Sequence, residues 1–221
     1  MPSSQANFWR GRLARQYHAV SVRTPAEIDR HWMHMLGRSR VGIDREMLSC
    51  VARETPILEV GCGTGNQLIA LAEMGFNNFA GIDINQEAVE IARERLPGAD
   101  IRLGTATDLP FNADSFGLVY TSALLIHIPP AEISAVQREI ARVANRWIYG
   151  YEYYSPSPVA RASTLGGVVY HPVPPLTFKA PFKDYYLGNC PALRVERAEM
   201  IKHSDGTGNA DEAFLLRKGD I

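Results

Sequence analysis

The sequence predicts a doubly wound α/β domain whose mostly parallel, seven-stranded sheet ends in a C-terminal antiparallel hairpin. Three observations lead to this fold class. Short apolar runs alternate with segments of helical spacing from residue 57 to residue 151. A glycine-rich turn follows the first apolar run. Two further apolar segments near the C-terminus are joined by a stretch of turn-forming residues, as in a hairpin. Such alternation implies βαβ units with right-handed crossovers.

The length and composition are those of one domain. With 221 residues, of which 46% are hydrophobic, the chain can bury one sizeable core. A formal net charge of -1 disfavours nucleic-acid and membrane-surface partners. The three separated cysteines indicate neither a disulfide framework nor a zinc site and suit a reducing cytoplasm. We therefore expect a cytoplasmic protein with no metal and no membrane-spanning segment, and a homodimer is left open.

Two helices are expected ahead of the sheet, between residues 25 and 53. Thr24 and Pro25 supply an N-cap followed by a proline at the first helical position. Apolar residues then recur at helical spacing in two groups. We assign residues 1–55 to an N-terminal helical cap and residues 56–221 to the core domain.

The core is expected to begin with a buried parallel strand at residues 57–60, which Pro56 precedes and Gly61 ends. Further strands are predicted at residues 79–83, 101–103, 118–120 and 147–151, and helices at 68–75, 86–96 and 133–144. Residues 193–201 and 213–218 are predicted to form the hairpin. Between them, residues 155–181 are rich in proline and show little periodicity, which indicates an ordered insertion over the ligand edge or a mobile flap.

The turn after the first strand has the sequence Glu-Val-Gly-Cys-Gly-Thr-Gly over residues 59–65. Glycines at such a position let the backbone turn tightly and approach a ligand. A dinucleotide fingerprint would place its third glycine at position 66, where Asn66 stands. A nucleoside-triphosphate loop would need a lysine that is missing here. The turn thus indicates a nucleoside cofactor with a less demanding anion.

This turn resembles the first motif of the class I S-adenosylmethionine (SAM)-dependent methyltransferases. The resemblance implies SAM as cofactor and S-adenosylhomocysteine (SAH) as product. Asp83, which ends the second strand, stands about 20 residues past the turn, where the doubly wound geometry brings a carboxylate onto a ribose. The other cofactor contacts that the resemblance implies are Tyr17, Glu59, Gly61, Cys62, Gly63, Gly65, Ile84, Thr105, Ala106 and Ser122.

Two positions depart from the family's pattern. In the segment after the third strand, Thr105 replaces the aspartate that would accept the adenine amino group, and Gly117 replaces the last aspartate of a later motif. These departures bear on cofactor affinity. A structural alternative also exists, in which the glycines serve strand and helix packing and Asp83 is a helix N-cap. Their joint occurrence at the strand ends favours cofactor binding.

Catalysis is expected at the carboxyl edge of the fourth strand. Methyl transfer from a sulfonium depends mainly on positioning, so a base is optional. His127 is the candidate base, although it could instead pack beneath the cofactor. Tyr151, Tyr153 and Tyr185 are candidate substrate contacts, or else packing for the proline-rich loop.

The segments 8–11, 124–130 and 151–158 loosely resemble methylases associated with pseudaminic acid biosynthesis and related clusters. This resemblance implies a sugar or secondary-metabolite acceptor with an O, N or C nucleophile. Two alternatives stay open. A SAM-binding protein of the same fold could act as a cyclase, a lyase or a noncatalytic partner subunit, and an NAD-linked reductase would bind NADH in preference to SAM.

Overall fold

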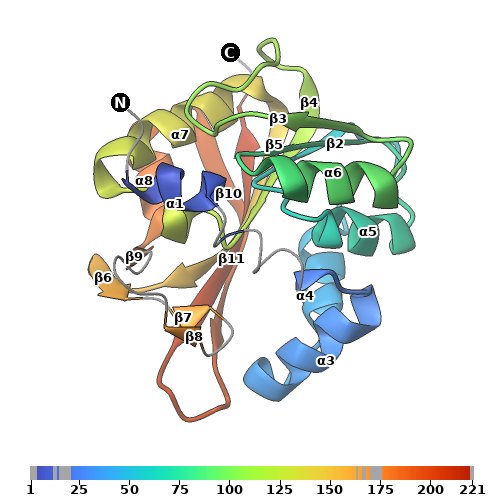
Figure 1. Cartoon of the computed structure of the whole chain (residues 1–221). Coiled ribbons are helices and arrows are strands. Elements are labelled where there is room, and N and C mark those ends of the chain that lie inside the picture. The colour runs from blue at the N-terminus through green and yellow to red at the C-terminus, as the bar shows by residue number, and fades with distance from the viewer. Residues whose placement is uncertain are drawn as a thin grey trace.

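Figure 1 shows the computed structural model of the chain, which describes residues 4–11, 14, 21–162, 164–165, 168–169 and 176–219. A central sheet has helices on both faces (Figure 1).

The sheet has seven strands in the order β10-β11-β5-β4-β1-β2-β3. Strands β1 to β5 run parallel, while β11 is antiparallel to both β5 and β10. The predicted seven-stranded sheet with its C-terminal hairpin is therefore confirmed. The strands are β1 (Ile57–Val60), β2 (Phe79–Asp83), β3 (Asp100–Leu103), β4 (Phe116–Ser122), β5 (Ala144–Tyr154), β10 (Leu193–Lys202) and β11 (Ala210–Lys218).

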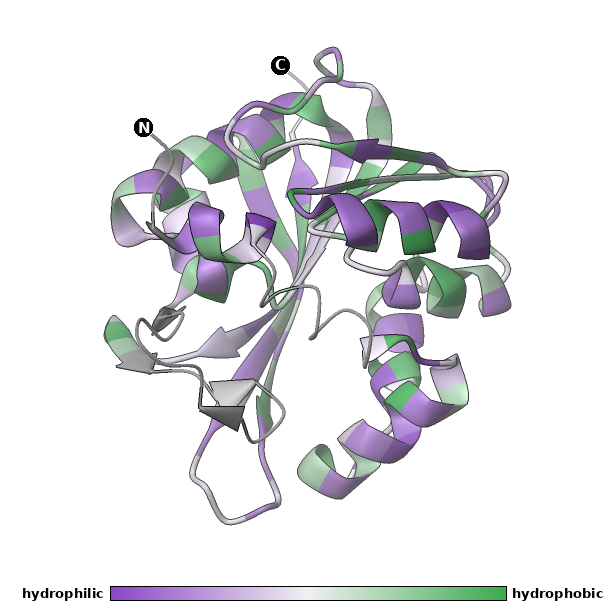
Figure 2. Cartoon of the chain, viewed as in Figure 1, coloured by the Kyte–Doolittle hydropathy of each residue, from purple (hydrophilic) through white to green (hydrophobic). Residues whose placement is uncertain are grey.

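Helices cover the sheet in two layers, each with its own apolar cluster. The clusters join α4, α5 and α6 to one face and α7 and α8 to the other. Figure 2 shows these helices banded in hydrophobic and hydrophilic colours, as expected of amphipathic helices lying on a sheet. The helices are α1 (Ser4–Arg10), α3 (Pro25–Leu36), α4 (Arg40–Met47), α5 (Asn66–Glu73), α6 (Gln86–Arg95), α7 (Pro130–Val143) and α8 (Phe182–Asn189), with one 3-10 turn, η1 (Leu125–His127).

The N-terminal helices form as the sequence predicts. Thr24 caps α3 in a capping box with Glu27, and Pro25 occupies its first turn. Gly37 ends α3 in the left-handed conformation, with φ of +67°. Whether residues 1–55 are a cap distinct from a core of residues 56–221 stays a prediction.

The described parts of the proline-rich region contain short antiparallel strands. β6 (Val159–Ala162) pairs with β9 (Leu176–Lys179), and β7 (Thr164–Leu165) pairs with β8 (Val168–Val169). β9 contacts η1, so this region approaches the loop after β4. Helix α8, which follows it, was not predicted. Among the described residues, no helix is long and apolar enough to cross a membrane.

Candidate cofactor site

The glycine-rich turn between β1 and α5 has a backbone that only glycine adopts easily. Gly61, Gly63 and Gly65 have φ values of +76°, +50° and +80°. A Cβ added to Gly61 would also lie 2.7 Å from Leu124 Cδ1, and one added to Gly65 would lie 2.9 Å from Leu96 Cδ1. A larger residue at Gly61 or Gly65 would therefore collide with Leu124 or Leu96 and change the path of the turn.

Asp83 joins this turn to the next βα unit. Its Oδ2 accepts the Gly63 N–H at 2.8 Å and its Oδ1 accepts the Asn85 N–H at 2.8 Å. The N-cap of α6 is Asn85, whose Oδ1 accepts the Ala88 N–H. Asp83 thus does not take the capping role that the sequence had left as an alternative.

Glu59 is a buried carboxylate beside the turn. It is 2% exposed, and its Oε2 has no hydrogen-bond partner among the described residues. Burial raises the pKa of Glu59 well above its usual range, against the opposing effect of Arg40. A buried acceptor without a donor is costly, and a cationic or amino ligand group would relieve that cost.

The other predicted cofactor contacts lie on neighbouring strands at the same edge. Ile84 follows β2 and is partly buried, and Ser122 ends β4. Thr105 is a half-buried residue after β3, with Oγ1 3.0 Å from Thr107 Oγ1, and Ala106 packs against the apolar cluster beside α7.

Cys62 is buried within the turn, and burial raises the pKa of its thiol. Since β4, β1, β2 and β3 are adjacent and parallel, their carboxyl ends meet at one edge. Tyr17 lies outside the described residues.

The loop after β4, residues 123–127, carries His127 and is called the β4 loop here. The His127 ring meets the Trp9 ring edge to face, with centroids 4.6 Å apart. Burial lowers the pKa of His127 to about 4, so the imidazole is neutral at pH 7. The Trp9 carbonyl accepts the side-chain N–H of Asn85 at 2.8 Å, which places α1 between the β4 loop and the start of α6. The role of His127 as a base stays a prediction.

The stretch of sequence that builds this edge of the sheet matches a known protein family. Residues 57–146 match the model of a family described as a methyltransferase domain. These residues belong to the methyltransferase domain family. The family-level prediction from the glycine-rich turn is thereby confirmed, while the looser resemblance to pseudaminic acid methylases stays a prediction.

Curated relatives match over part of the chain. An uncharacterised methyltransferase of Synechocystis sp. is 33% identical over 87 residues, which cover 39% of this chain and 41% of the relative. An O-methyltransferase of Penicillium expansum is 36% identical over 99 residues, which cover 42% of this chain and 36% of the relative. The chain thus spans about two fifths of the length of the curated relatives it matches.

Solved structures share the fold along more of the chain. Magnesium protoporphyrin IX methyltransferase from Synechocystis PCC 6803, solved with bound SAH, has a TM-score of 0.66 at 16% identity and covers 97% of this chain and 98% of its own. A SAM-dependent methyltransferase from Methanosarcina mazei has a TM-score of 0.64 at 20% identity, over 80% of this chain and 97% of its own. A [4+2]-cyclase has a TM-score of 0.63 at 18% identity, over 81% of this chain and 80% of its own. At these identities the likeness shows the class I fold.

A buried ion pair that sequence reasoning missed attaches helix α4 to the methyltransferase domain. Arg40 is 0% exposed and donates to Asp44 at 3.1 Å, to Ser122 Oγ at 3.3 Å and to the Tyr120 hydroxyl. Its guanidinium lies 3.6 Å from the ring centroid of Tyr151. A signal was present in the sequence, because Arg40 and Asp44 are four residues apart within the apolar stripe of α4.

The three candidate substrate tyrosines are not gathered at one place. Tyr151 is 1% exposed, and its hydroxyl donates to Asp211 at 2.9 Å. Tyr153 is partly buried, 5.3 Å from the ammonium of Lys179. Tyr185 lies on α8 and packs with the cluster on the opposite face of the sheet from Tyr151. Their role as substrate contacts stays a prediction.

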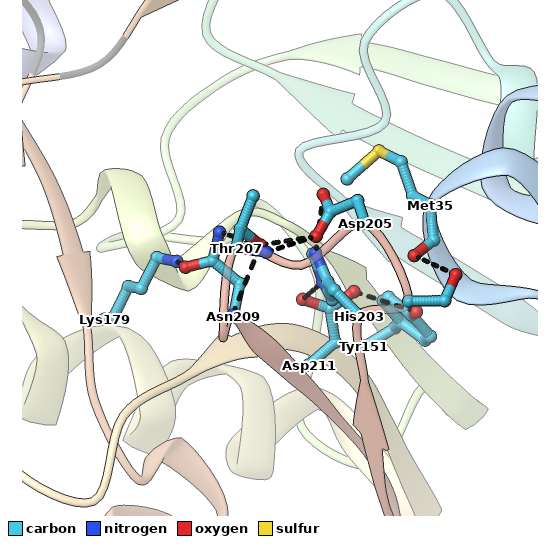
Figure 3. Close-up of polar contacts among 9 residues, drawn as sticks. Met35, Tyr151, Lys179, His203, Asp205, Thr207, Asn209 and Asp211 are labelled. Atoms are coloured by element: carbon cyan, nitrogen blue, oxygen red, sulfur yellow. Dashed lines mark hydrogen bonds and ion pairs between the residues drawn. The ribbon is translucent and has the colours of Figure 1, made fainter.

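The tip of the β10–β11 hairpin carries a polar cluster outside the methyltransferase domain (Figure 3). Asp211, 0% exposed, accepts from Tyr151 and lies 3.0 Å from His203 Nε2. This hydrogen bond raises the pKa of His203. The Ser204 N–H donates to the Met35 carbonyl at 2.8 Å, so the cluster fixes the hairpin to α3.

A shallow pocket of about 290 Å³ lies beyond the end of β5. It is lined by residues of β5, β9, β10 and β11, among them Tyr154, Lys179, Met200 and Lys202. Its walls combine an aromatic ring and an apolar side chain with two ammonium groups. Among the described residues, no cluster of histidine, cysteine, aspartate or glutamate could hold a metal ion.

Proposed function

We propose that the chain binds SAM at the carboxyl edge of β1, β2 and β4 and transfers its methyl group to a small-molecule acceptor, with release of SAH. The observation that carries the proposal is the glycine turn with positive φ angles, flanked by two carboxylates, Glu59 and Asp83, within the matched residues 57–146. Such a turn leaves a ligand in contact with backbone rather than with side chains.

Each predicted contact has a role in this proposal. Glu59 Oε2, a buried acceptor without a donor, would receive the amino group of the methionine moiety. Asp83 would bind the ribose hydroxyls. The adenine would lie by Ile84, Thr105 and Ala106, and the remaining proposed contacts are the turn residues, Ser122 and Tyr17.

The chain's contribution to the reaction would be positioning and exclusion of water. SAM itself supplies a methyl group already activated on a sulfonium, so geometry accounts for most of the rate. Trp9 of α1 covers the β4 loop and would shield the site from solvent. As a base, His127 would act in its neutral form, and its low pKa makes it a weak proton acceptor for any nucleophile that must be deprotonated.

The acceptor would approach from the ends of β4 and β5. A sugar or secondary metabolite with an O, N or C nucleophile fits the proposal. Tyr153 and Tyr185 are partly exposed and could contact it directly, whereas buried Tyr151 would act through Arg40.

Calorimetric titration with SAH tests the cofactor site. We expect micromolar binding by the wild-type chain and loss of binding in Asp83→Ala. Asp100→Ala is the matched control, because Asp100 begins β3 at the opposite edge of the sheet and its carboxylate accepts from Arg102. A wild-type chain that does not bind SAH would contradict the proposal.

Incubation with SAM and a panel of acceptors tests the transfer step. Formation of SAH that depends on an added acceptor supports methyl transfer. Retention of SAM without SAH formation across sugars and secondary metabolites would instead favour a non-methylating cyclase, lyase or partner subunit.

A further inference from the structure

The side chain of Glu152, on β5, binds the backbone of the β4 loop. Glu152 is 1% exposed, and its carboxylate oxygens lie 3.3 Å from the Leu124 nitrogen and 3.1 Å from the Leu125 nitrogen, both of which donate to it. Burial raises the pKa of Glu152 to about 8, and the backbone N–H groups of Leu125 and Leu124 that donate to its carboxyl group oppose this rise.

The loop needs such a restraint because its first residue has an unfavourable backbone conformation. Ala123 has φ of +51°, a region that non-glycine residues enter only when the surroundings hold them there. Its N–H donates to the Tyr151 carbonyl at 2.9 Å. Two consecutive residues of β5, Tyr151 and Glu152, therefore fix three consecutive N–H groups of the β4 loop.

The restrained loop contacts the cofactor site at two points. Leu124 lies so close to the glycine turn that a Cβ on Gly61 would come within 2.7 Å of it. His127, three residues on, packs against Trp9, which in turn is bonded to Asn85 after β2. A shift of the loop would thus move the side chain over Gly61 and the ring beneath α1 together.

We infer that Glu152 is a positioning residue of the cofactor site, which keeps Leu124 against Gly61 by holding the N–H groups of the β4 loop. This inference rests on the proposed function, since Gly61 forms the surface on which the methionine moiety of SAM would lie. Glu152 itself acts through Leu124.

The test compares SAH affinities by calorimetry in a double-mutant cycle. In Glu152→Gln, one acceptor oxygen is replaced by an NH₂ group that faces a backbone N–H, so the loop should shift. We expect about a tenfold or greater rise in the SAH dissociation constant, equivalent to roughly 1.4 kcal/mol. Leu124→Ala should give a similar rise. The SAH dissociation constant of the double variant should equal that of the single variant that binds SAH less tightly. The two effects should not multiply, because both substitutions act through the contact of Leu124 with Gly61.

The control is Glu212→Gln, which alters the glutamate directly across from Glu152 on β11. Glu212 is also buried, but its carboxylate pairs with Lys183 and does not touch the β4 loop. We expect its SAH affinity to stay within about twofold of wild type, although its melting temperature falls.

Other results separate failure of the inference from failure of the proposed function. If the wild-type chain does not bind SAH, the proposed function fails. If the wild-type chain binds SAH and Glu152→Gln binds it equally well, or the two effects multiply, the inference is wrong. Should Glu152→Gln not fold, Leu124→Ala decides, because the half-buried Leu124 can be truncated without opening the core, and wild-type affinity in that variant overturns the inference.

Discussion

His127 shows how its surroundings fix the charge of one residue. The ring lies against Trp9, and burial lowers its pKa from the usual 6.5 to about 4. A histidine with a lowered folded pKa favours the folded state above its unfolded pKa, and that stability is lost as the pH falls through the folded value. The consequence is a pH-dependent stability that can be measured without a substrate.

We predict that acidification from pH 7 to pH 5 lowers the free energy of unfolding of the wild-type chain by about 2 kcal/mol more than that of His127→Phe. Between these pH values the imidazole is protonated in the unfolded chain but stays mostly neutral in the folded chain. Urea unfolding at the two pH values measures this difference. His34→Phe removes an exposed histidine of α3 and should leave the wild-type pH dependence in place. Equal pH dependence in wild type and His127→Phe would show that His127 is not shielded.

At the level of single residues, the sequence pointed to the glycines of the turn and to Asp83 because glycines and an aspartate at strand ends are a local signature. Glu152 and Arg40 were missed because their main partners lie 27 and 80 positions away in the chain, although the spacing of Arg40 and Asp44 was a signal. The pairing of β4 with β5 brings Glu152 to the β4 loop.

At the scale of elements, one buried carboxylate helps to hold the tip of the β10–β11 hairpin. Asp211 accepts from Tyr151 of β5 and bonds His203, which follows β10, while Ser204 bonds the end of α3 (Figure 3). Removing the carboxylate would leave the Tyr151 hydroxyl and the imidazole without their partner, and such losses in a buried network are costly.

We predict that Asp211→Ala lowers the free energy of unfolding by about 2–4 kcal/mol. Differential scanning calorimetry measures the change. Asp205→Ala removes a second aspartate of the same hairpin tip, which bonds Thr207 within the tip, and should cost less than about 1 kcal/mol. Equal losses in the two variants would mean that the hairpin is not held through Asp211.

Elements with strong periodicity were predicted to within a few residues, and those without it were not. β2 begins and ends where the apolar run does, and the capping box begins α3 at Pro25. Helix α8 was missed because Phe182–Asn189 mixes aromatic and polar residues without a clear apolar stripe. Its helical state is fixed by tertiary packing of Phe182 and Tyr186 against the sheet and α7.

For the whole molecule, the buried Arg40–Asp44 pair links the N-terminal helices to the sheet. Arg40 reaches β4, and Asp44 accepts from the Tyr149 hydroxyl of β5. Removing one member of a buried pair leaves an uncompensated charge, which costs far more than the loss of a surface pair.

We predict that Arg40→Met lowers the free energy of unfolding by about 3–5 kcal/mol. Arg38→Met, two residues earlier, loses half-exposed ion pairs with Glu46 and Glu199 and should cost less than about 1 kcal/mol. Urea unfolding followed by fluorescence and by circular dichroism measures both changes, and coincident curves would show one cooperative unit. A loss in Arg40→Met no larger than that in Arg38→Met would contradict the prediction.

The position of Arg40 also sets an order of events during synthesis. Tyr120, whose hydroxyl accepts from Arg40, is translated 80 residues after it. Tyr149, whose hydroxyl donates to Asp44, is translated 105 residues after it. Helices α3 and α4 leave the ribosome before the strands of the sheet, yet their final contacts cannot form until β5 has emerged. Until then, their apolar faces remain without the strands that cover them in the folded protein.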